Sequence, residues 1–402
     1  MSQSKKTDKK NKYDSDVDYS VAIDDIKNYS PDDAYKPYVP PTEEEIEQRQ
    51  IEKEKKRKKS LGKKIALTIL IILLVILIAA GGTFAILHGK GKKMLDKTGA
   101  DIKSEGGVIE DDGKTIYYNG KIYTLNEKIT AIACLGIDKE ELDAYGVTGS
   151  AGQNDTNVIL VIDTSKGTAT AINIPRDTMV DVDVFDVGGN RTGSEYEQLC
   201  LAYAYGDGFA SSCENAVTSI ERVLYGMPVK SYIALDLSGI SVLNDYVGGV
   251  SVVSPETVSE FTQGQRVTLY GQSSVNFVRA RGKDVNASLR RSERQMTYIR
   301  AFADKAVQNA KQSPGTIKGL YDTTMGYCTT NVGLSNVTFL ASSLLGSGFH
   351  GLETVTLPGE MKMGEKYAEY YMDKAAAYEM VLDIFYEVTG TYDETTAASE
   401  AA

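Results

Sequence analysis

The chain has 402 residues, a formal net charge of −11, four cysteines and only two histidines. The negative charge argues against a nucleic-acid partner, because nucleic-acid-binding domains usually carry basic patches. His88 directly follows a long apolar run and His350 lies in a Gly-Phe-His-Gly turn, so a Ser–His or Cys–His triad is not expected. Any catalysis must therefore depend on carboxylates, arginines or a metal.

The N-terminal part divides into a polar tail and an apolar span. Residues 1–62 have almost no apolar runs and cannot bury enough surface to offset the entropy of ordering, so we predict a disordered tail. The segment Ile65–Leu87 has no charged residue and is long enough to cross a bilayer. A cleaved signal peptide would have a shorter apolar core. We therefore predict a retained transmembrane helix over 63–88.

The charges that flank this span predict its orientation. Eight basic residues lie between Lys53 and Lys64, and four lie between Lys90 and Lys97. The positive-inside rule makes the N-terminus cytoplasmic, which predicts a single-pass cell-membrane protein whose folded domain is extracellular. The basic cluster could instead contact nucleic acid, but its position against the span favours lipid headgroups.

All four cysteines follow the predicted span, on the side where disulfides are permitted. None of them has the spacing of zinc ligands. Cys200 and Cys213 flank a segment that could form a helix, a glycine turn and a second helix, so a Cys200–Cys213 disulfide is geometrically plausible. Buried free thiols are the alternative.

The outer region begins with a Gly- and Lys-rich stalk over 89–128. Asn119-Gly120 joins two strand-like runs there, 115–118 and 121–124, which is a strong signal for a β-hairpin. A compact domain is predicted over 129–390, and residues 391–402 form a polar tail that is predicted to be disordered.

The pattern within the compact domain is typical of an α/β layered fold. Five apolar runs are predicted to be strands, at 129–138, 158–163, 168–174, 230–236 and 247–253. A helix is expected over about 211–224, before a Gly and a Pro that end it. Beyond residue 269 the pattern is mostly helical, with long helices at about 289–310 and 367–386.

The hexapeptide Asn173–Thr178 places an arginine and a carboxylate where a buried strand ends. Pro175 must stop the strand, because it has no N–H group to donate. Arg176 then projects from a rigid strand end, where a guanidinium can bind phosphate through two parallel hydrogen bonds. A purely structural pair of Arg176 and Asp177 is the alternative.

Two further polar groups accompany this hexapeptide. Asp138 ends the first strand and Asp155 precedes the second, so the two could hold Mg²⁺, which binds one or two carboxylates together with substrate phosphate oxygens. They could also simply cap turns. Five arginines within sixteen residues suit a substrate with several negative charges, such as a pyrophosphate: Arg279, Arg281, Arg290, Arg291 and Arg294.

In order and spacing, the motifs between residues 129 and 388 resemble those of the LytR-CpsA-Psr family of bacterial cell-wall ligases. The motifs are Leu135-Gly-Ile-Asp138, Asp155-Thr156, Ile174-Pro-Arg-Asp-Thr178, Tyr203-Ala-Tyr-Gly206, Val247-Gly-Gly-Val250, Arg279-Ala-Arg281 and Arg294-Gln295. The resemblance implies an α/β/α sandwich with a central mixed β-sheet and an apolar groove for a polyprenyl chain. It also makes 129–390 the catalytic domain.

The resemblance further implies an activity. The expected enzyme is a Mg²⁺-dependent phosphotransferase of the membrane surface. It would move an anionic glycopolymer, such as teichoic acid or capsule, from a polyprenyl-pyrophosphate carrier to peptidoglycan. Metal and guanidinium groups would neutralise the charge on the phosphate oxygens.

By matched position, the resemblance also implies the residues of the site. Asp138 and Asp155 would bind Mg²⁺. The residues expected to contact the pyrophosphate are Arg176, Arg279, Arg281, Arg291 and Gln295. The catalytic group would be Arg176, Asp177 and Arg291, with Asp177 orienting Arg176 rather than acting as a base.

The sequence departs from the family pattern at two positions. Gln153 stands where the family usually has arginine, and Ser288 stands where it usually has a carboxylate. The first loss should weaken pyrophosphate binding, and the second leaves open which group deprotonates the acceptor hydroxyl. Both favour one alternative to the ligase, a non-catalytic polyprenyl-phosphate-binding sensor or scaffold. A second alternative is a lipid pyrophosphatase, in which water is the acceptor. A transcriptional attenuator is not expected, because it would need a DNA-binding helix pair that residues 1–62 do not offer.

Overall fold

The structure is a computed structural model that describes residue 48 and residues 102–110, 113–142, 149–349 and 351–393. The predicted transmembrane helix over 63–88, the predicted N-terminal tail and the end of the C-terminal tail lie outside the described residues. Within the part that the structure describes, no helix combines the length and the apolar character that a bilayer crossing requires.

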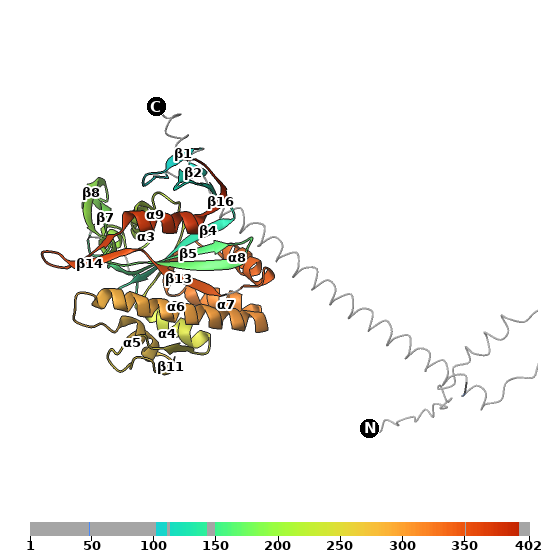
Figure 1. Ribbon diagram of the computed structural model, residues 1–402. Helices are drawn as coiled ribbons and strands as arrows, with labels where there is room; N and C mark the ends of the chain where they lie inside the picture. Colours follow the sequence, from blue (N-terminus) through green and yellow to red (C-terminus); the bar gives the residue numbers. More distant parts are fainter. Residues whose placement is uncertain (1–47, 49–101, 111–112, 143–148, 350, 394–402) are drawn as a thin grey trace, which may run out of the picture. The chain divides into compact units, whose positions relative to one another are not determined.

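Six strands form the central sheet, in the order β12-β9-β4-β5-β6-β13 (Figure 1). Their bounds are β4 (Ile129–Ile137), β5 (Asn154–Asp163), β6 (Thr168–Ile174), β9 (Ser231–Leu235), β12 (Cys328–Thr330) and β13 (Leu352–Thr356). β9 is parallel to β4, and β13 is parallel to β6, whereas β5 is antiparallel to both β4 and β6. The sheet is therefore mixed, as predicted, and the ends of β4 and β6 flank the start of β5.

Helices cover both faces of this sheet (Figure 1). The 3₁₀ helix η3 (Leu199–Tyr205), α3 (Ala210–Val223) and α9 (Lys374–Phe385) pack on one side, which we call the α3–α9 face. The other side, the α6–α8 face, is covered by α6 (Ala287–Gln312) and α8 (Leu334–Gly346). Neighbouring residues of a strand point to opposite faces, so Ile159 joins the first core and Val158 the second. The expected sandwich is confirmed, as are the helices predicted near 211–224 and 289–310.

A smaller apolar cluster lies on the outer side of α6. It joins α4 (Leu237–Tyr246), α5 (Gln272–Arg279) and the hairpin of β10 (Val250–Val253) and β11 (Arg266–Leu269). The strand predicted from residue 247 begins only at Val250. Gly248 and Gly249 adopt φ values of 88° and 82°, a conformation that glycine tolerates and that a strand excludes.

The predicted hairpin is confirmed as β2 (Thr115–Tyr118) and β3 (Lys121–Leu125). Its two turn residues have positive φ, 49° at Asn119 and 71° at Gly120, as the favoured two-residue turn requires. The hairpin belongs to a four-stranded sheet with β1 (Val108–Glu110) and the C-terminal β16 (Tyr386–Thr391). Ile116 and Tyr123 are buried in the core of the α3–α9 face, so this region is part of the folded domain.

The C-terminal part contains more strand than the sequence suggests. The helix expected over 367–386 begins only at Lys374, because the side chain of Asp373 accepts a hydrogen bond from the N–H of Ala376 and caps it there. The preceding residues form β15 (Ala368–Met372), which pairs with β14 (Gly359–Met363). A second hairpin, of β7 (Met179–Phe185) and β8 (Arg191–Gln198), was not predicted either.

Cys200 and Cys213 do not form the disulfide that the sequence made plausible, because both thiols are free, as in the alternative that the sequence left open. Cys213 lies on α3 and packs in the core beneath it. Cys200 lies on η3, which directs its thiol to Arg176 instead. The glycine-containing segment between the two cysteines therefore brings the helices together without pairing their sulfur atoms.

Candidate functional site

The turn after β6 fixes the position of Arg176. Pro175 ends the strand, and its carbonyl oxygen accepts hydrogen bonds from the N–H of Thr178 at 3.0 Å and from the Thr178 hydroxyl at 2.6 Å. The turn is thus closed by backbone and side chain together. Because β4 and β6 flank β5, Arg176 lies beside Asp155 near the start of β5.

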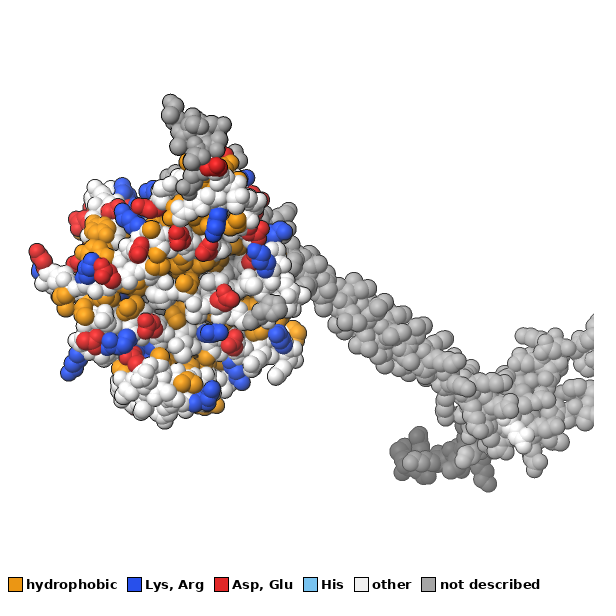
Figure 2. Space-filling view, viewed as in Figure 1, with side chains coloured by type: hydrophobic (Ala, Val, Ile, Leu, Met, Phe, Trp, Pro, Cys, Tyr) orange, Lys and Arg blue, Asp and Glu red, His pale blue; other side chains and the backbone are white. Residues whose placement is uncertain are grey.

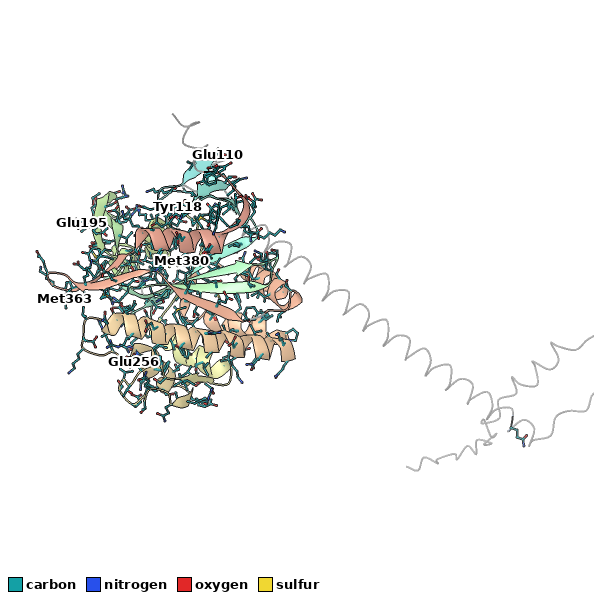
Figure 3. All side chains as sticks on the ribbon, viewed as in Figure 1. Glu110, Tyr118, Glu195, Glu256, Met363 and Met380 are labelled. Atoms are coloured by element: carbon teal, nitrogen blue, oxygen red, sulfur yellow. The ribbon has the colours of Figure 1, made fainter. Side chains whose placement is uncertain are left out.

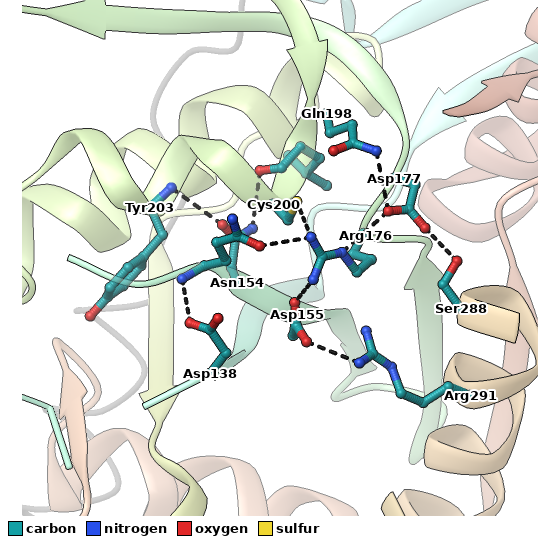
Figure 4. A network of polar contacts seen from close by, with 12 residues as sticks. Asp138, Asn154, Asp155, Arg176, Asp177, Gln198, Cys200, Tyr203, Ser288 and Arg291 are labelled. Carbon is teal, nitrogen blue, oxygen red and sulfur yellow. Dashed lines mark hydrogen bonds and ion pairs between the residues drawn. The ribbon is translucent and has the colours of Figure 1, made fainter. Parts of the chain in front are cut away.

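All of the Arg176 nitrogens contact protein groups (Figure 4). Nη1 donates to Oδ1 of Asp155, and Nε donates to Asp177 at 3.2 Å. Nη2 donates to the Gln153 side chain at 2.7 Å and to the Cys200 thiol at 2.9 Å. The guanidinium predicted to grip the pyrophosphate is therefore already held by its neighbours, and its direct effect is to position Asp155.

Asp177 is buried, and both of its carboxylate oxygens accept hydrogen bonds. Oδ1 faces Arg176 and the Gln198 amide, the latter at 3.3 Å, and Oδ2 accepts the hydroxyl of Ser288 on α6. A carboxylate saturated in this way orients its partners. Ser288, which stands where a carboxylate was expected, thereby ties α6 to the turn after β6.

Arg291 is the cation of the site that keeps free hydrogen-bonding capacity. Its Nη1 lies 3.0 Å from Oδ2 of Asp155, but the buried Nε and Nη2 have no partner in the described part of the chain. Burial, reinforced by the like charges of Arg176 and Arg281, lowers the pKa of Arg291 to about 10. Buried polar groups are nearly always hydrogen-bonded, so these two N–H groups can each donate to a bound acceptor.

Gln295 lies one turn beyond Arg291 on the same helix and completes this arrangement. Its amide nitrogen donates to the carbonyl of Val278 at 3.1 Å, while its buried carbonyl oxygen has no partner in the region that the structure describes. Unpaired donors and an unpaired acceptor therefore stand side by side on α6.

Arg290 pairs with Glu256 and Asp284, and the other three arginines of the predicted cluster separate into two kinds. Arg279 and Arg281 are exposed, and Arg279 makes one contact of 3.5 Å with Glu140. Arg294 is fully buried and donates to the carbonyls of Phe277 and Ala280 at the end of α5. Arg294 is therefore structural: it anchors the segment that presents Arg279 and Arg281 to solvent.

Asp138 lies exposed directly after β4. Its Oδ1 accepts the N–H of Gln153 at 2.6 Å, and its own N–H donates to the Gln153 carbonyl at 3.1 Å. Gly152, just before, has φ of 99°, and a Cβ there would lie 3.1 Å from Asp138 Oδ1. The Asp138 carboxylate thus holds the turn that carries Gln153 to Arg176.

Sequence reasoning missed two partners in this network. Gln198, at the end of β8, bridges Asp177 and the carbonyl of Ala368. Cys200, for which a disulfide and a free thiol were both open, places its thiol on Arg176, and burial raises the pKa of that thiol to about 11. The one available signal was position, since both residues shortly precede the Tyr203–Gly206 motif.

The α6–α8 face of the sheet is loosely covered beside this site. Cys134, Leu160 and Ile233 point to it from the middle strands and remain partly accessible. Burial raises the pKa of Cys134 to about 12. α7 (Gly315–Thr324), which packs against α6 and α8, has no buried residue. Apolar side chains on this face therefore remain partly accessible.

Comparison with known protein families agrees with this geometry. Residues 84–384 match the LytR_cpsA_psr family. The chain belongs to this family. The family model spans the whole network around Arg176 and Arg291.

Relatives of known name share part of their length with this chain. A polyisoprenyl-teichoic acid–peptidoglycan teichoic acid transferase, TagU, of Oceanobacillus iheyensis is 29% identical over 44% of this chain and 51% of its own length. The Bacillus subtilis transferase TagV is 23% identical over 65% of each chain, and Enterococcus faecalis TagU is 27% identical over 61% of this chain and 72% of its own. The chain spans about half to two thirds of the first two of these relatives.

Solved structures support the fold. Streptococcus agalactiae protein gbs0355 superposes with a TM-score of 0.53 at 17% identity, covering 68% of this chain and 95% of its own. An Enterococcus faecalis protein described as a transcriptional regulator superposes with a TM-score of 0.50 at 21% identity, covering 64% and 88%. Both share the architecture of this chain.

Proposed function

We propose that this chain is a phosphotransferase that moves an anionic glycopolymer from a polyprenyl-pyrophosphate carrier to peptidoglycan. The observation that carries the proposal is Arg291, a buried guanidinium with two N–H groups that have no partner among the described residues and can donate to phosphate oxygens. Family membership and the names of the relatives, which are teichoic acid transferases, support the same reaction class.

In this proposal the pyrophosphate oxygens accept hydrogen bonds from Nε and Nη2 of Arg291. Arg279 and Arg281 add positive charge from the rim. Arg176 acts on the pyrophosphate indirectly. It forms an ion pair with Asp155, and Asp155 forms an ion pair with Nη1 of Arg291. A guanidinium fixed by its neighbours is preorganised, so little reorganisation is needed when charge develops on the phosphate.

The reaction itself is an exchange at phosphorus. A sugar hydroxyl of the acceptor attacks the phosphorus that bears the glycopolymer, and a new P–O bond forms. The bond to the bridging oxygen breaks, and polyprenyl phosphate leaves with the hydroxyl proton. The arginines neutralise charge on the transferred and leaving oxygens, as is general for phosphoryl transfer.

We propose Mg²⁺ as the cofactor, held by Asp138 and Asp155. The donors fit this ion, since Asp138 is exposed and Mg²⁺ needs only one or two carboxylates when phosphate oxygens complete its shell. Asp155 would exchange one guanidinium contact for the ion. The described residues contain no group of three or more metal-ligating side chains, so substrate and water would supply the other ligands. When bound, the ion would neutralise phosphate charge.

The lipid would lie along the α6–α8 face, whose half-buried apolar side chains support this placement. A chain along that face would bring its pyrophosphate to Arg291 near the N-terminal end of α6. The predicted transmembrane helix over 63–88 would keep the domain at the outer surface of the cell membrane, where lipid carrier and peptidoglycan are both in reach.

The test measures transfer of polymer from a polyprenyl-pyrophosphate donor to peptidoglycan by the full-length protein. Arg291→Ala should lower the rate by about a hundredfold or more, on the scale of a lost transition-state donor. Arg300→Ala, an exposed arginine farther along α6, is the control and should retain the rate. Transfer by Arg291→Ala at the wild-type rate would contradict the proposal. Release of polymer without attachment would indicate a pyrophosphatase, and bound lipid without turnover a sensor.

A further inference from the structure

One edge of the central sheet, formed by β13, has no strand beside it in the described part of the chain. β13 pairs with β6 alone, in parallel. The N–H of Leu357 donates to the carbonyl of Asn173 at 2.9 Å, and backbone groups of successive strand residues point to opposite edges. The N–H and C=O groups of Thr354 and Thr356 therefore point away from β6, and Thr354 is exposed. An edge of this kind can pair with a further strand.

A hollow of about 590 Å³ adjoins this edge on the α3–α9 face. α9 lies on one side of it, and Thr170 of β6 together with Glu353 and Val355 of β13 lies on the other. Met380, labelled in Figure 3, lines the hollow from α9. We call this space the α9 hollow. Its position leaves room for side chains beside β13 on this face of the sheet.

A second hollow, of about 720 Å³, adjoins the same edge on the α6–α8 face. Thr354 and Thr356 of β13 line it, as do Val252 and Val253 of β10. We call it the α6 hollow, and Figure 1 shows β13 between α9 and α6. Side chains of a strand point to the two faces in turn, so a strand added to β13 would place them alternately in the α9 hollow and the α6 hollow.

The two hollows differ in charge. The α9 hollow is lined by four carboxylates and one lysine: Asp163, Glu353, Glu379, Asp383 and Lys166. Lys166 pairs with Glu387 at 2.6 Å, whereas Glu353 and Asp383 are exposed and make no ion pair within the described chain. Figure 2 shows acidic side chains among apolar ones beneath α9.

The α6 hollow is balanced in charge. Two arginines and two carboxylates line it together with uncharged side chains of α6 and β10: Arg266, Arg300, Glu293 and Asp304. An occupant that complements both hollows therefore carries basic side chains on one side and uncharged ones on the other.

We propose that the β13 edge is a docking site for an extended peptide segment of a partner protein with lysine or arginine at alternate positions. The peptide backbone pairs with Thr354 and Thr356, the basic side chains enter the α9 hollow, and the intervening apolar or hydroxyl side chains enter the α6 hollow. A second copy of this chain does not complement the edge, because pairing two β13 strands would place one acidic α9 hollow beside another. The inference goes beyond the proposed function, since neither Arg176 nor Arg291 lines either hollow.

The test is fluorescence anisotropy of the full-length protein in detergent with a fluorescein-labelled peptide, Thr-Lys-Val-Lys-Thr-Lys-Val-amide. Thr354→Pro should weaken peptide binding by about tenfold or more, because proline removes an outward N–H and leaves the bonds to β6 in place. Thr354→Ala keeps this N–H, so it is the matched control and should bind like the wild type. Glu353→Gln/Asp383→Asn, which leaves the backbone unchanged, should weaken binding about tenfold.

The outcomes separate this inference from the proposed function. No binding of the peptide to the wild type, or equal binding to Thr354→Pro and Thr354→Ala, overturns the inference. Equally tight binding of a peptide with glutamate in place of lysine also overturns it. A wild-type dimer that Thr354→Pro converts to a monomer would assign the edge to a second copy instead. Selective loss of peptide binding in Thr354→Pro and in Glu353→Gln/Asp383→Asn, with polymer transfer at the wild-type rate, supports it.

Discussion

The two faces of the central sheet are built from the same strands and covered in opposite ways. On the α3–α9 face, Ala133, Ile159 and Ile172 have no accessible surface. On the α6–α8 face, their neighbours Cys134 and Leu160 remain partly accessible. At these positions the α3–α9 face is sealed, whereas the α6–α8 face leaves some apolar side chains partly accessible.

Substitutions at two adjacent residues of β5 test the difference between the two sheet faces most strongly. Ile159→Ala should destabilise the protein by about 3–4 kcal/mol, since the sealed face cannot collapse around the cavity. Leu160→Ala should cost about 1–2 kcal/mol, because its side chain is already partly exposed. Urea unfolding of the two variants gives both values. Equal losses would show that the faces are packed alike.

We expect Arg291 to lower the free energy of unfolding of the protein while it serves donor binding. Burial without full pairing lowers its pKa to about 10, so the folded state disfavours the charge. Arg291→Met should therefore raise the free energy of unfolding by about 1–2 kcal/mol near neutral pH. The same variant should lose donor binding. Because the folded pKa lies below the unfolded one, this gain should shrink as the pH rises through 10, and a variant that is destabilised would contradict the assignment.

The charge of Asp183 should stabilise the folded protein, in contrast to the charge of Arg291. Burial alone would raise the pKa of Asp183, but hydrogen bonds from Arg191, Ser194 and Arg222 of α3 hold it at about 2. Since the folded pKa is below the unfolded one, the stabilisation is present above pH 4 and is lost as the pH falls toward 2. After allowance for solvent screening we expect about 1 kcal/mol.

Acid unfolding of Asp183→Asn tests this expectation. The variant should be less stable than the wild type at pH 6, and the difference should vanish near pH 2. A difference that does not depend on pH would mean that the loss comes from packing rather than from the ion pairs.

The smallest effect on stability should come from filling the loosely covered face. Leu160→Phe adds volume where accessible space exists, so we expect a change in unfolding free energy of less than about 0.5 kcal/mol, unlike overpacking of a sealed core. Affinity for polyprenyl phosphate should fall. The matched substitution Ile159→Phe, on the sealed side of the same strand, should instead destabilise by about 1–3 kcal/mol.

Much of the architecture follows from local sequence rules. The Asn119-Gly120 turn, the apolar strands and the long helix α6 were predictable because their signals are local. β13 and β15 were not predicted: β13 pairs with β6, which lies far back along the chain, and β15 pairs with β14 in a hairpin where a helix was expected. The glycines at 248 and 249 shortened a strand whose apolar run looked continuous.

The candidate site, too, was only partly predictable from the sequence. Arg176, Asp155 and Arg291 were predicted and do lie together. Their different roles were not predictable, because only the structure shows that protein groups contact every nitrogen of Arg176 while two N–H groups of Arg291 have no partner among the described residues. Likewise, the sequence left open whether Cys200 forms a disulfide or stays a free thiol, since nothing in it says where η3 directs the thiol. Roles that depend on the direction of a side chain require tertiary structure.

The most direct test of the central claim maps where the lipid lies. Full-length protein is incubated with a polyprenyl phosphate that carries a photoreactive diazirine in its first isoprene units, and the adducts are located by peptide mass spectrometry. We expect adducts on Leu160, Ile233 and Ile299, and their loss when unlabelled polyprenyl phosphate competes. Adducts on α3 or α9, or labelling that competitor does not reduce, would contradict the claim that the α6–α8 face is the binding face.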